Sequence, residues 1–399
     1  MTLAVVGASL AGLRAVESAR RTGYRGRIVL IGAEEHLPYD RPPLSKAFLS
    51  PDGPRAVEPF LSQDELRELD VELCLGSPAI GLDPIAREVR TADATIPYVA
   101  AVIATGATAR TLPGTAGISG IHSLRTAEDA LAVRSALESG ARTVVVGAGF
   151  IGSEVASSAR KRGLPVTIVE SLDTPLVRAV GAEVGTVCAD LHRAAGTDLR
   201  LGTDVTGFET ADGAVTGVEL SSGETVPADL VVTGIGAVPA TGWLRGSGLL
   251  LHERDGGIVC DSTLAAAHGV YAAGDVAHVA NALFDGELMR LEHWTNAAEQ
   301  GAAAARHALD PANARVFSAV PYFWSDWYDR RIQFVGTPRA DQVSTVPAEH
   351  GFTALYRRGD RLVGAFTIDR PRDIMKYRKR IAARAPWSEA VSFAHEMAA

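Results

Sequence analysis

Two stretches of this chain repeat the same order of elements. Residues 3–19 and 143–160 each read as an apolar strand, a glycine turn and a helix, followed by a second apolar strand that ends near an acid. The two turns begin at Gly7 and Gly147, about 140 residues apart. Because a strand–helix–strand unit builds a parallel sheet, the repeat predicts an α/β protein with two Rossmann-like lobes.

Other buried strand patterns set the expected domain order. Three of these strand patterns end in glycine turns, at residues 101–106, 229–236 and 270–275. Their order along the chain predicts that the second lobe is inserted in the first. After Pro321, aromatic and alternating segments predict a C-terminal α+β domain with a mainly antiparallel sheet. We therefore expect a discontinuous first domain over 1–110 and 245–320, a second over 111–244 and a third over 321–399. Residues 386–399 fit either a helix or a loose tail.

Composition excludes several classes of protein. The net charge of -8 and pI near 5.7 argue against a nucleic-acid binder. No apolar run reaches the roughly 18 residues that a membrane span needs. The three cysteines, Cys74, Cys188 and Cys260, are too dispersed for a metal cluster or a disulfide framework. We expect a cytoplasmic protein without a metal.

The second glycine turn has the complete GxGxxG pattern. Its first glycine permits a tight turn, its second lets a pyrophosphate approach the backbone, and its third lets the helix pack on the strand. Glu170, 18 residues after Gly152, is placed to bind ribose hydroxyls and to repel a 2′-phosphate. The pattern predicts an NADH site that includes Gly147, Gly149, Phe150, Ile151, Gly152 and Glu170. A plain glycine turn is the simpler alternative.

The first glycine turn departs from this pattern. Ser9 stands at the second glycine position, where its Cβ crowds a pyrophosphate although its hydroxyl can donate to one. Glu34 lies 22 residues after Gly12 and can bind an adenosine ribose. We expect a second dinucleotide to lie against Gly7, Ser9, Leu10, Ala11, Gly12 and Glu34.

A longer segment makes a family resemblance specific. Residues 38–46 read Pro-Tyr-Asp-Arg-Pro-Pro-Leu-Ser-Lys, which resembles the FAD-dependent ferredoxin reductases that serve bacterial cytochrome P450s and Rieske oxygenases, the putidaredoxin reductase and biphenyl dioxygenase ferredoxin reductase type. The wider group is the glutathione-reductase-like flavoproteins with two dinucleotide-binding domains. The resemblance runs nearly end to end through Thr105–Gly106, residues 124–129, Gly234–Gly236, Pro239, Gly274–Asp275, residues 291–294, 296–297, Gln300 and residues 322–326.

The resemblance implies FAD in the first lobe. Asp275 would bind a ribityl hydroxyl, Arg41 the pyrophosphate side, and Lys46 would lie beside flavin N5 and pair with Glu154. It implies that Glu292 and Trp294 line the flavin and nicotinamide, and that Trp324 lies at the flavin edge facing a partner. Relatives usually have glutamine where this chain has Trp327, so we expect a different rim on the partner face. The remaining contacts implied are Pro43, Thr105, Gly106, Arg125, Gly234, Ile235, Gly236, Gly274 and His293.

Simpler interpretations remain open for single residues. Lys46 can be a solvated loop lysine, and Glu154 a first-turn acid that favours the helix dipole. Trp294 and His293 can be core packing, which is the commoner role of such residues.

The resemblance and the cysteine positions together imply a reaction. Residues 40–50 contain no cysteine, so reduced FAD has no neighbouring thiol to reduce. We expect hydride transfer from NADH to FAD and single electrons to a [2Fe–2S] ferredoxin, without a protein acid or base in the hydride step. Six basic residues between Arg370 and Arg380 favour an acidic partner, although an ordinary solvated helix face has the same composition.

Two other functions stay open. One is an NADH oxidase or diaphorase that reduces dioxygen or a quinone, and the other is a binding flavoprotein resembling apoptosis-inducing factor. Both a monomer and a homodimer fit the sequence.

Overall fold

The computed structural model describes residues 1–346 and 351–398. Contacts divide the chain into two compact units: residues 1–40, 58–108 and 238–323 form the first, and residues 41–57, 109–237 and 324–399 contribute to the second. The expected domain bounds follow chain order, whereas contacts place residues 41–57 in the second unit. There Arg134 Nη1 donates to the carbonyl of Phe48 over 2.9 Å.

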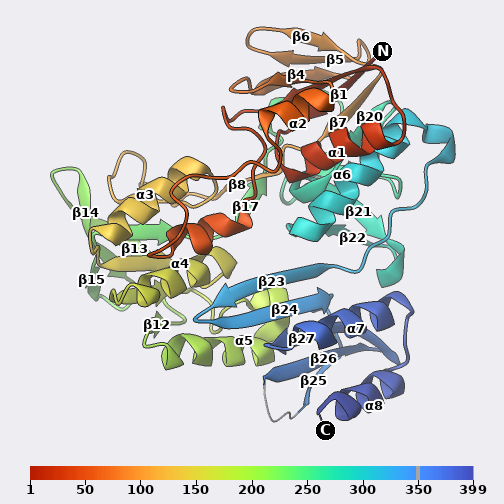
Figure 1. The fold of residues 1–399 in the computed structure, drawn as a ribbon. Helices are drawn as coiled ribbons and strands as arrows, with labels where there is room; N and C mark the ends of the chain where they lie inside the picture. The colour runs from red at the N-terminus through yellow and green to blue at the C-terminus, as the bar shows by residue number, and fades with distance from the viewer. Residues whose placement is uncertain (347–350, 399) are drawn as a thin grey trace. The chain divides into compact units, whose positions relative to one another are not determined.

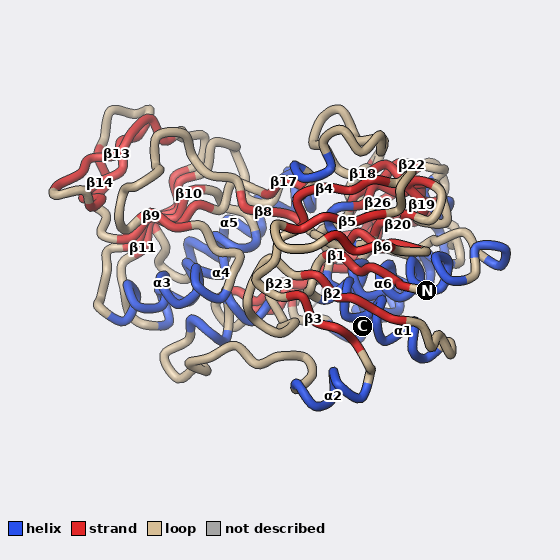
Figure 2. The backbone as a smooth tube through the Cα atoms, turned by 90° about the horizontal axis from the view of Figure 1, so that it is seen from above, coloured by secondary structure: helices blue, strands red, loops and turns tan. Residues whose placement is uncertain are grey.

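A six-stranded sheet forms the centre of the first unit (Figure 1). Its order is β19 (Ala265–Ala267), β20 (Val270–Ala272), β7 (Ala100–Ile103), β1 (Thr2–Val6), β2 (Arg27–Ile31) and β3 (Val71–Cys74). Strands β1, β2 and β3 run side by side (Figure 2), and all neighbours are parallel except β19 and β20. Apolar residues on both faces of β1 are buried, as a covered parallel sheet requires.

Two helices of this unit pack closely together, α1 (Leu10–Arg21) and α6 (Trp294–Leu309) (Figure 1). A Cβ on Gly301 of α6 would lie 2.1 Å from the carbonyl oxygen of Ala11, so only glycine permits this approach. The unit also contains α2 (Gln63–Glu68), an antiparallel sheet of β4 (Ala79–Asp83), β5 (Glu88–Thr91) and β6 (Thr95–Pro97), and a mixed sheet of β18 (Ile258–Cys260), β21 (Ala277–Asn281) and β22 (Glu287–Arg290).

A second parallel sheet lies in the other unit. Its order is β12 (Asp198–Arg200), β11 (Val166–Val169), β10 (Thr143–Val146), β16 (Leu230–Thr233) and β9 (Ile121–His122). The helices of this lobe are α3 (Ala127–Glu138), α4 (Phe150–Lys161) and α5 (Val177–Ala194), and its antiparallel sheet contains β13 (Val205–Ala211), β14 (Ala214–Leu220) and β15 (Thr225–Pro227). Strands β8 (Ala107–Ala109) and β17 (Ala237–Pro239) carry the chain between units.

The C-terminal sheet is antiparallel, as expected. Its order is β23 (Tyr322–Trp327), β24 (Arg330–Gly336), β27 (Arg361–Ile368), β26 (Phe352–Arg358) and β25 (Gln342–Val346). Helix α7 (Pro371–Ala382) packs on β24 and β27, and α8 (Trp387–Ala398) on β25 and β27. The C-terminal segment is therefore a helix rather than a loose tail; Ala399 lies outside the described residues.

The predicted fold class is confirmed: two parallel α/β lobes and a C-terminal α+β sheet. Among the described residues, no helix combines the length and the apolarity needed to cross a bilayer.

Candidate functional site

The glycine turn of the first unit lies where the strand order reverses. Strands β2 and β7 flank β1, and ligands of open parallel sheets bind at the carboxyl ends of strands at such a point. A Cβ on Gly7 would lie 2.1 Å from the carbonyl oxygen of Ala104, and one on Gly12 would lie 1.9 Å from that of Gly7. Both glycines are therefore required by the tight turn. Residues 10–12 begin α1, whose N-cap Ser9 makes no side-chain capping bond.

The acid after β2 is held by a tyrosine from the 38–46 segment. Tyr39 is buried, and its hydroxyl donates to Oε2 of Glu34 over 2.6 Å. Thr105 and Gly106, which follow β7, are both bonded to Ala240. Thr105 Oγ1 donates to the carbonyl oxygen of Ala240, and the N–H of Ala240 donates to the carbonyl oxygen of Gly106, both over 2.9 Å. These hydrogen bonds hold in place the residues predicted to bind the adenosine part of a dinucleotide in the first unit.

A second cluster of this unit surrounds Asp275. The N–H of Gly274 donates to the buried Gln300 over 2.8 Å, and Arg290 Nη1 donates to the backbone carbonyl of Asp275 over 2.9 Å. The same Arg290 nitrogen lies 2.7 Å from Oε1 of Glu292. Arg290 therefore joins two of the predicted flavin-site residues, a role that the sequence did not indicate.

Trp294 begins α6 and is anchored by its indole nitrogen. Its Nε1 donates to Oδ1 of Asp40 over 2.8 Å. The preceding His293 is partly buried near Phe323, and desolvation lowers its pKa to about 4. A neutral imidazole in contact with Phe323 fits a packing role for His293, whereas the oriented indole of Trp294 fits a role in shaping the site.

In the second glycine turn, two glycines are required by packing within the protein, and a third leaves space for a ligand. A Cβ on Gly147 would lie 2.6 Å from the carbonyl oxygen of Gly234. A Cβ on Gly152 would lie 2.2 Å from the carbonyl oxygen of Gly147. A Cβ on Gly149 would meet only that Gly234 oxygen, at an ordinary 3.4 Å. Internal packing does not require glycine at 149, so the space there fits a bound pyrophosphate. Phe150, Ile151 and Gly152 form the first turn of α4, and Ile235 and Gly236 continue the loop after β16.

Glu170 lies directly against this turn. Its carboxylate accepts the N–H of Ala148 over 2.8 Å and that of Leu172 over 3.0 Å. The acid is therefore fixed at the carboxyl end of β11 beside the glycine loop, the position from which a ribose is bound.

Lys46 and Glu154 form an ion pair, with Lys46 Nζ 2.7 Å from Glu154 Oε1. The glutamate is 2% exposed and is supported by two serines: Ser45 donates to Oε2 and Ser325 to Oε1. A buried carboxylate is costly unless several donors satisfy it. Neither a solvated lysine nor an acid that serves only the helix dipole describes this pair. The sequence did not point to Ser325, which is 171 residues from Glu154.

Three further residues predicted to contact the cofactors, Arg41, Pro43 and Arg125, lie in or against residues 41–46. Arg41 Nη1 donates to the carbonyl of Arg125 over 2.7 Å. Arg125 precedes α3, whose start is a capping box of Thr126 and Asp129. Pro43 is the second residue of a short 3-10 helix, Pro42–Ser45, that leads into Lys46.

Strand β23 corrects the expectation for Trp327. Its residues alternate between partly exposed and buried, so Trp324 and Asp326 lie on one face and Ser325 and Trp327 on the other. Trp327 is 0% exposed. The expectation that it alters the rim of the partner face was wrong, because the strand register turns its side chain into the core. Trp324 lies on the accessible face, with the Arg331 guanidinium 5.9 Å from its ring centroid.

Two of the three cysteines are buried and poorly suited to thiol chemistry. All three are free, and burial raises the pKa of Cys188 and of Cys260 to about 12. Cys74 is partly buried and ends β3.

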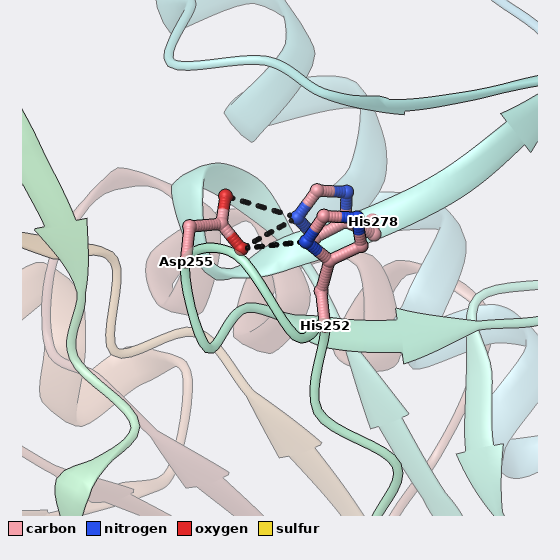
Figure 3. A group of neighbouring side chains, drawn as sticks. All are labelled: His252, Asp255 and His278. Atoms are coloured by element: carbon pink, nitrogen blue, oxygen red, sulfur yellow. Dashed lines mark hydrogen bonds and ion pairs between the residues drawn. The ribbon is translucent and has the colours of Figure 1, made fainter.

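One group of possible metal ligands occurs among the described residues: His252, Asp255 and His278 (Figure 3). The imidazole rings stack with centroids 4.2 Å apart and planes 16° apart, so their lone pairs lie in nearly parallel planes and do not converge on one ion. Arg290 Nε, 2.8 Å from Oδ2 of Asp255, already supplies a cation. Burial opposes ionisation of Asp255, but bonds from Gly257, His278 and Arg290 hold its pKa below the usual range. The group is a charge network around Asp255.

Together these sites define a class: an oxidoreductase that binds one dinucleotide at each of two parallel-sheet lobes. A family model described as pyridine nucleotide-disulphide oxidoreductase matches residues 1–301, and one described as reductase C-terminal matches residues 322–397. The chain belongs to the pyridine nucleotide-disulphide oxidoreductase family, and its cofactors are FAD and a nicotinamide dinucleotide.

Three known proteins illustrate the similarity. Rhodocoxin reductase from Rhodococcus erythropolis is 38% identical over 97% of this chain and 90% of its own length. The ferredoxin reductase for the CYP199A2 system from Rhodopseudomonas palustris is 33% identical with a TM-score of 0.92, covering 100% of both chains. The covalent putidaredoxin reductase–putidaredoxin complex gives 31% identity and a TM-score of 0.91, over 96% of this chain and 94% of that one.

Proposed function

We propose that this chain is an NADH-dependent reductase that passes electrons through FAD, one at a time, to a [2Fe–2S] ferredoxin that serves a cytochrome P450 or a Rieske oxygenase. The observation that carries the proposal is the ion pair between Lys46 and the buried Glu154 of α4, the helix that begins at the Gly147–Gly152 turn. Similarity to reductases of ferredoxin-dependent systems supports the choice of partner.

The residues have separate tasks in this function. Glu170 binds the adenosine ribose of NADH and disfavours a 2′-phosphate, while Gly149 leaves space for the pyrophosphate. Glu34 binds the other ribose, and Lys46 presents positive charge to the flavin site. When bound, FAD supplies hydride acceptance and single-electron release. No side chain has to move a proton in the hydride step.

Helix α7 supports an acidic partner. Part of its charge is neutralised locally, because Arg370 Nε lies 2.7 Å from Asp373, and Arg380 lies over the ring of Phe393 at 3.5 Å. Arg372 and Lys379 are exposed and form no ion pair with any described residue. These two residues are the better docking candidates, because changing Arg380 would also disturb packing.

The test of the function uses the FAD-loaded protein and NADH. Cytochrome c reduction is measured with and without a [2Fe–2S] ferredoxin, together with oxygen uptake. Strong dependence on ferredoxin supports the proposal. Rapid oxygen uptake without ferredoxin would identify an oxidase, and slow turnover with every acceptor would identify a binding flavoprotein.

The docking surface has its own test. Arg372→Glu with Lys379→Glu should raise the ferredoxin KM at low salt by about tenfold, within the range of electrostatic steering, and leave NADH–ferricyanide turnover unchanged. An unchanged ferredoxin KM would remove α7 from the interface.

A further inference from the structure

The inner face of β23 holds the Glu154 carboxylate through a chain of two side chains. Trp327 Nε1 lies 2.7 Å from Ser325 Oγ, and Ser325 Oγ bonds to Glu154 Oε1. An indole N–H can only donate, so the serine oxygen accepts from Trp327. The serine hydroxyl hydrogen is then directed to the carboxylate. Trp327 therefore orients Ser325, and Ser325 orients Glu154.

Trp327 is itself held from its other side. The His192 ring lies against it in a tilted arrangement, with centroids 4.9 Å apart and a 30° angle between planes. His192 Nδ1 lies 2.8 Å from the Tyr328 hydroxyl, and its Nε2 lies 3.2 Å from the Ser153 hydroxyl. Ser153 precedes Glu154 on α4, so the imidazole links the tryptophan back to the same helix turn. The indole is thus fixed in position.

Three side chains donate to the Glu154 carboxylate. Lys46 and Ser325 share Oε1, and Ser45 takes Oε2. A serine bond satisfies part of the carboxylate's negative charge, which leaves the Lys46 ammonium less completely neutralised. Loss of the Ser325 bond would let Glu154 compensate Lys46 more fully.

We propose that Ser325 and Trp327 are positioning residues of the C-terminal sheet that set the location and effective charge of Lys46, and through it the reduction potential of the bound flavin. The inference rests on the proposed function, in which Lys46 presents its charge to the flavin. It adds that a strand outside both dinucleotide-binding sheets controls that charge.

Ser325→Ala is the central test, measured by redox titration of the purified FAD-loaded protein without ferredoxin. The reduction potential should become more negative, and flavin bleaching by NADH should slow by about tenfold, the effect of one hydrogen bond to a charged group. Ser325→Thr keeps the hydroxyl and should restore both values. Trp327→Phe keeps the ring against His192 but removes the N–H, and should shift the potential in the same direction by a smaller amount.

Ser344→Ala provides the matched control, because Ser344 lies in β25 of the same sheet and its described bond is with Gln342. Its potential should equal that of the unaltered protein. An unaltered potential in both Ser325→Ala and Trp327→Phe would overturn the inference, even if ferredoxin were reduced normally. Failure to reduce ferredoxin, with the shifted potential present, would instead count against the proposed function alone.

Discussion

The hydroxyl of Tyr39 donates a 2.6 Å hydrogen bond to Oε2 of Glu34, the acid that follows β2. Tyr39→Phe removes this bond and leaves the ring in the core. Since a hydrogen bond to a charged group contributes about 1.5–3 kcal/mol, FAD affinity should fall by about tenfold or more. Fluorescence titration of the apoprotein with FAD measures this loss. The NADH affinity of the reloaded protein should be unchanged; a parallel loss would show that the bond supports the whole fold.

The glycines of the second turn should separate binding from stability. Gly149→Ala should raise the KM for NADH at least tenfold but change the free energy of unfolding by no more than about 0.5 kcal/mol, because its Cβ has room within the protein. Gly147 has φ +100 and its Cβ would lie 2.6 Å from Gly234 O. Gly147→Ala should therefore destabilise the protein by about 1–3 kcal/mol in urea unfolding. Equal destabilisation by both changes would contradict this division.

Glu170 should determine the choice of nicotinamide cofactor. Glu170→Arg replaces a carboxylate that disfavours a 2′-phosphate with a cation that attracts it, so the ratio of kcat/KM for NADPH to that for NADH should rise by about 100-fold. The carboxylate also holds the Ala148 N–H, so activity with both cofactors should decline. Glu170→Gln, which keeps an acceptor, is the control for that loss. A ratio unaltered by Glu170→Arg would exclude Glu170 as the ribose ligand.

Lys46 and Glu154 should be strongly coupled in stability. Lys46→Ala leaves a carboxylate that is 2% exposed without its cation, which should cost about 3–5 kcal/mol of unfolding free energy. Adding Glu154→Gln should recover part of that loss, because the remaining buried group is then neutral. Urea unfolding of the two single variants and the double variant measures the coupling. Additive losses would mean that the two charges do not interact.

Lowering the pH should destabilise the protein already at pH values above those at which carboxylates titrate, because His192 is buried in its neutral form. Burial, with Arg193 adding to the effect, lowers the pKa of His192 from 6.5 to about 4. Between these values the unfolded chain binds a proton that the folded chain does not, so stability is complete above pH 6.5 and declines as the pH falls toward 4. At about 1.4 kcal/mol per pKa unit the part of the loss that His192 contributes approaches about 3 kcal/mol. Urea unfolding from pH 7.5 to 4.5 should show this slope, and His192→Gln should reduce it.

Local patterns carried most of the information about the fold. Strand–turn–helix repeats at Gly7 and Gly147 are short-range signals, and the glycines are required by contacts within each turn. The acids Glu34 and Glu170 follow their strands directly, so their places depend on little beyond the parallel sheet. The expectation for Trp327, which came from the family resemblance and not from a local pattern, failed because the side to which a strand residue points depends on the register of its sheet.

The sequence by itself determined two glycine turns, the acids that follow them and the antiparallel character of the C-terminal domain, since each is encoded within a few neighbouring residues. Tertiary structure alone decided that Ser325 meets Glu154, that Tyr39 supports Glu34 and that Arg290 joins Asp255 to Asp275 and Glu292. Among these acids Glu154 is buried, and its carboxylate therefore needs several donors. The nearest donor to a buried charge is set by packing between elements that are distant in the chain, and no local pattern records it.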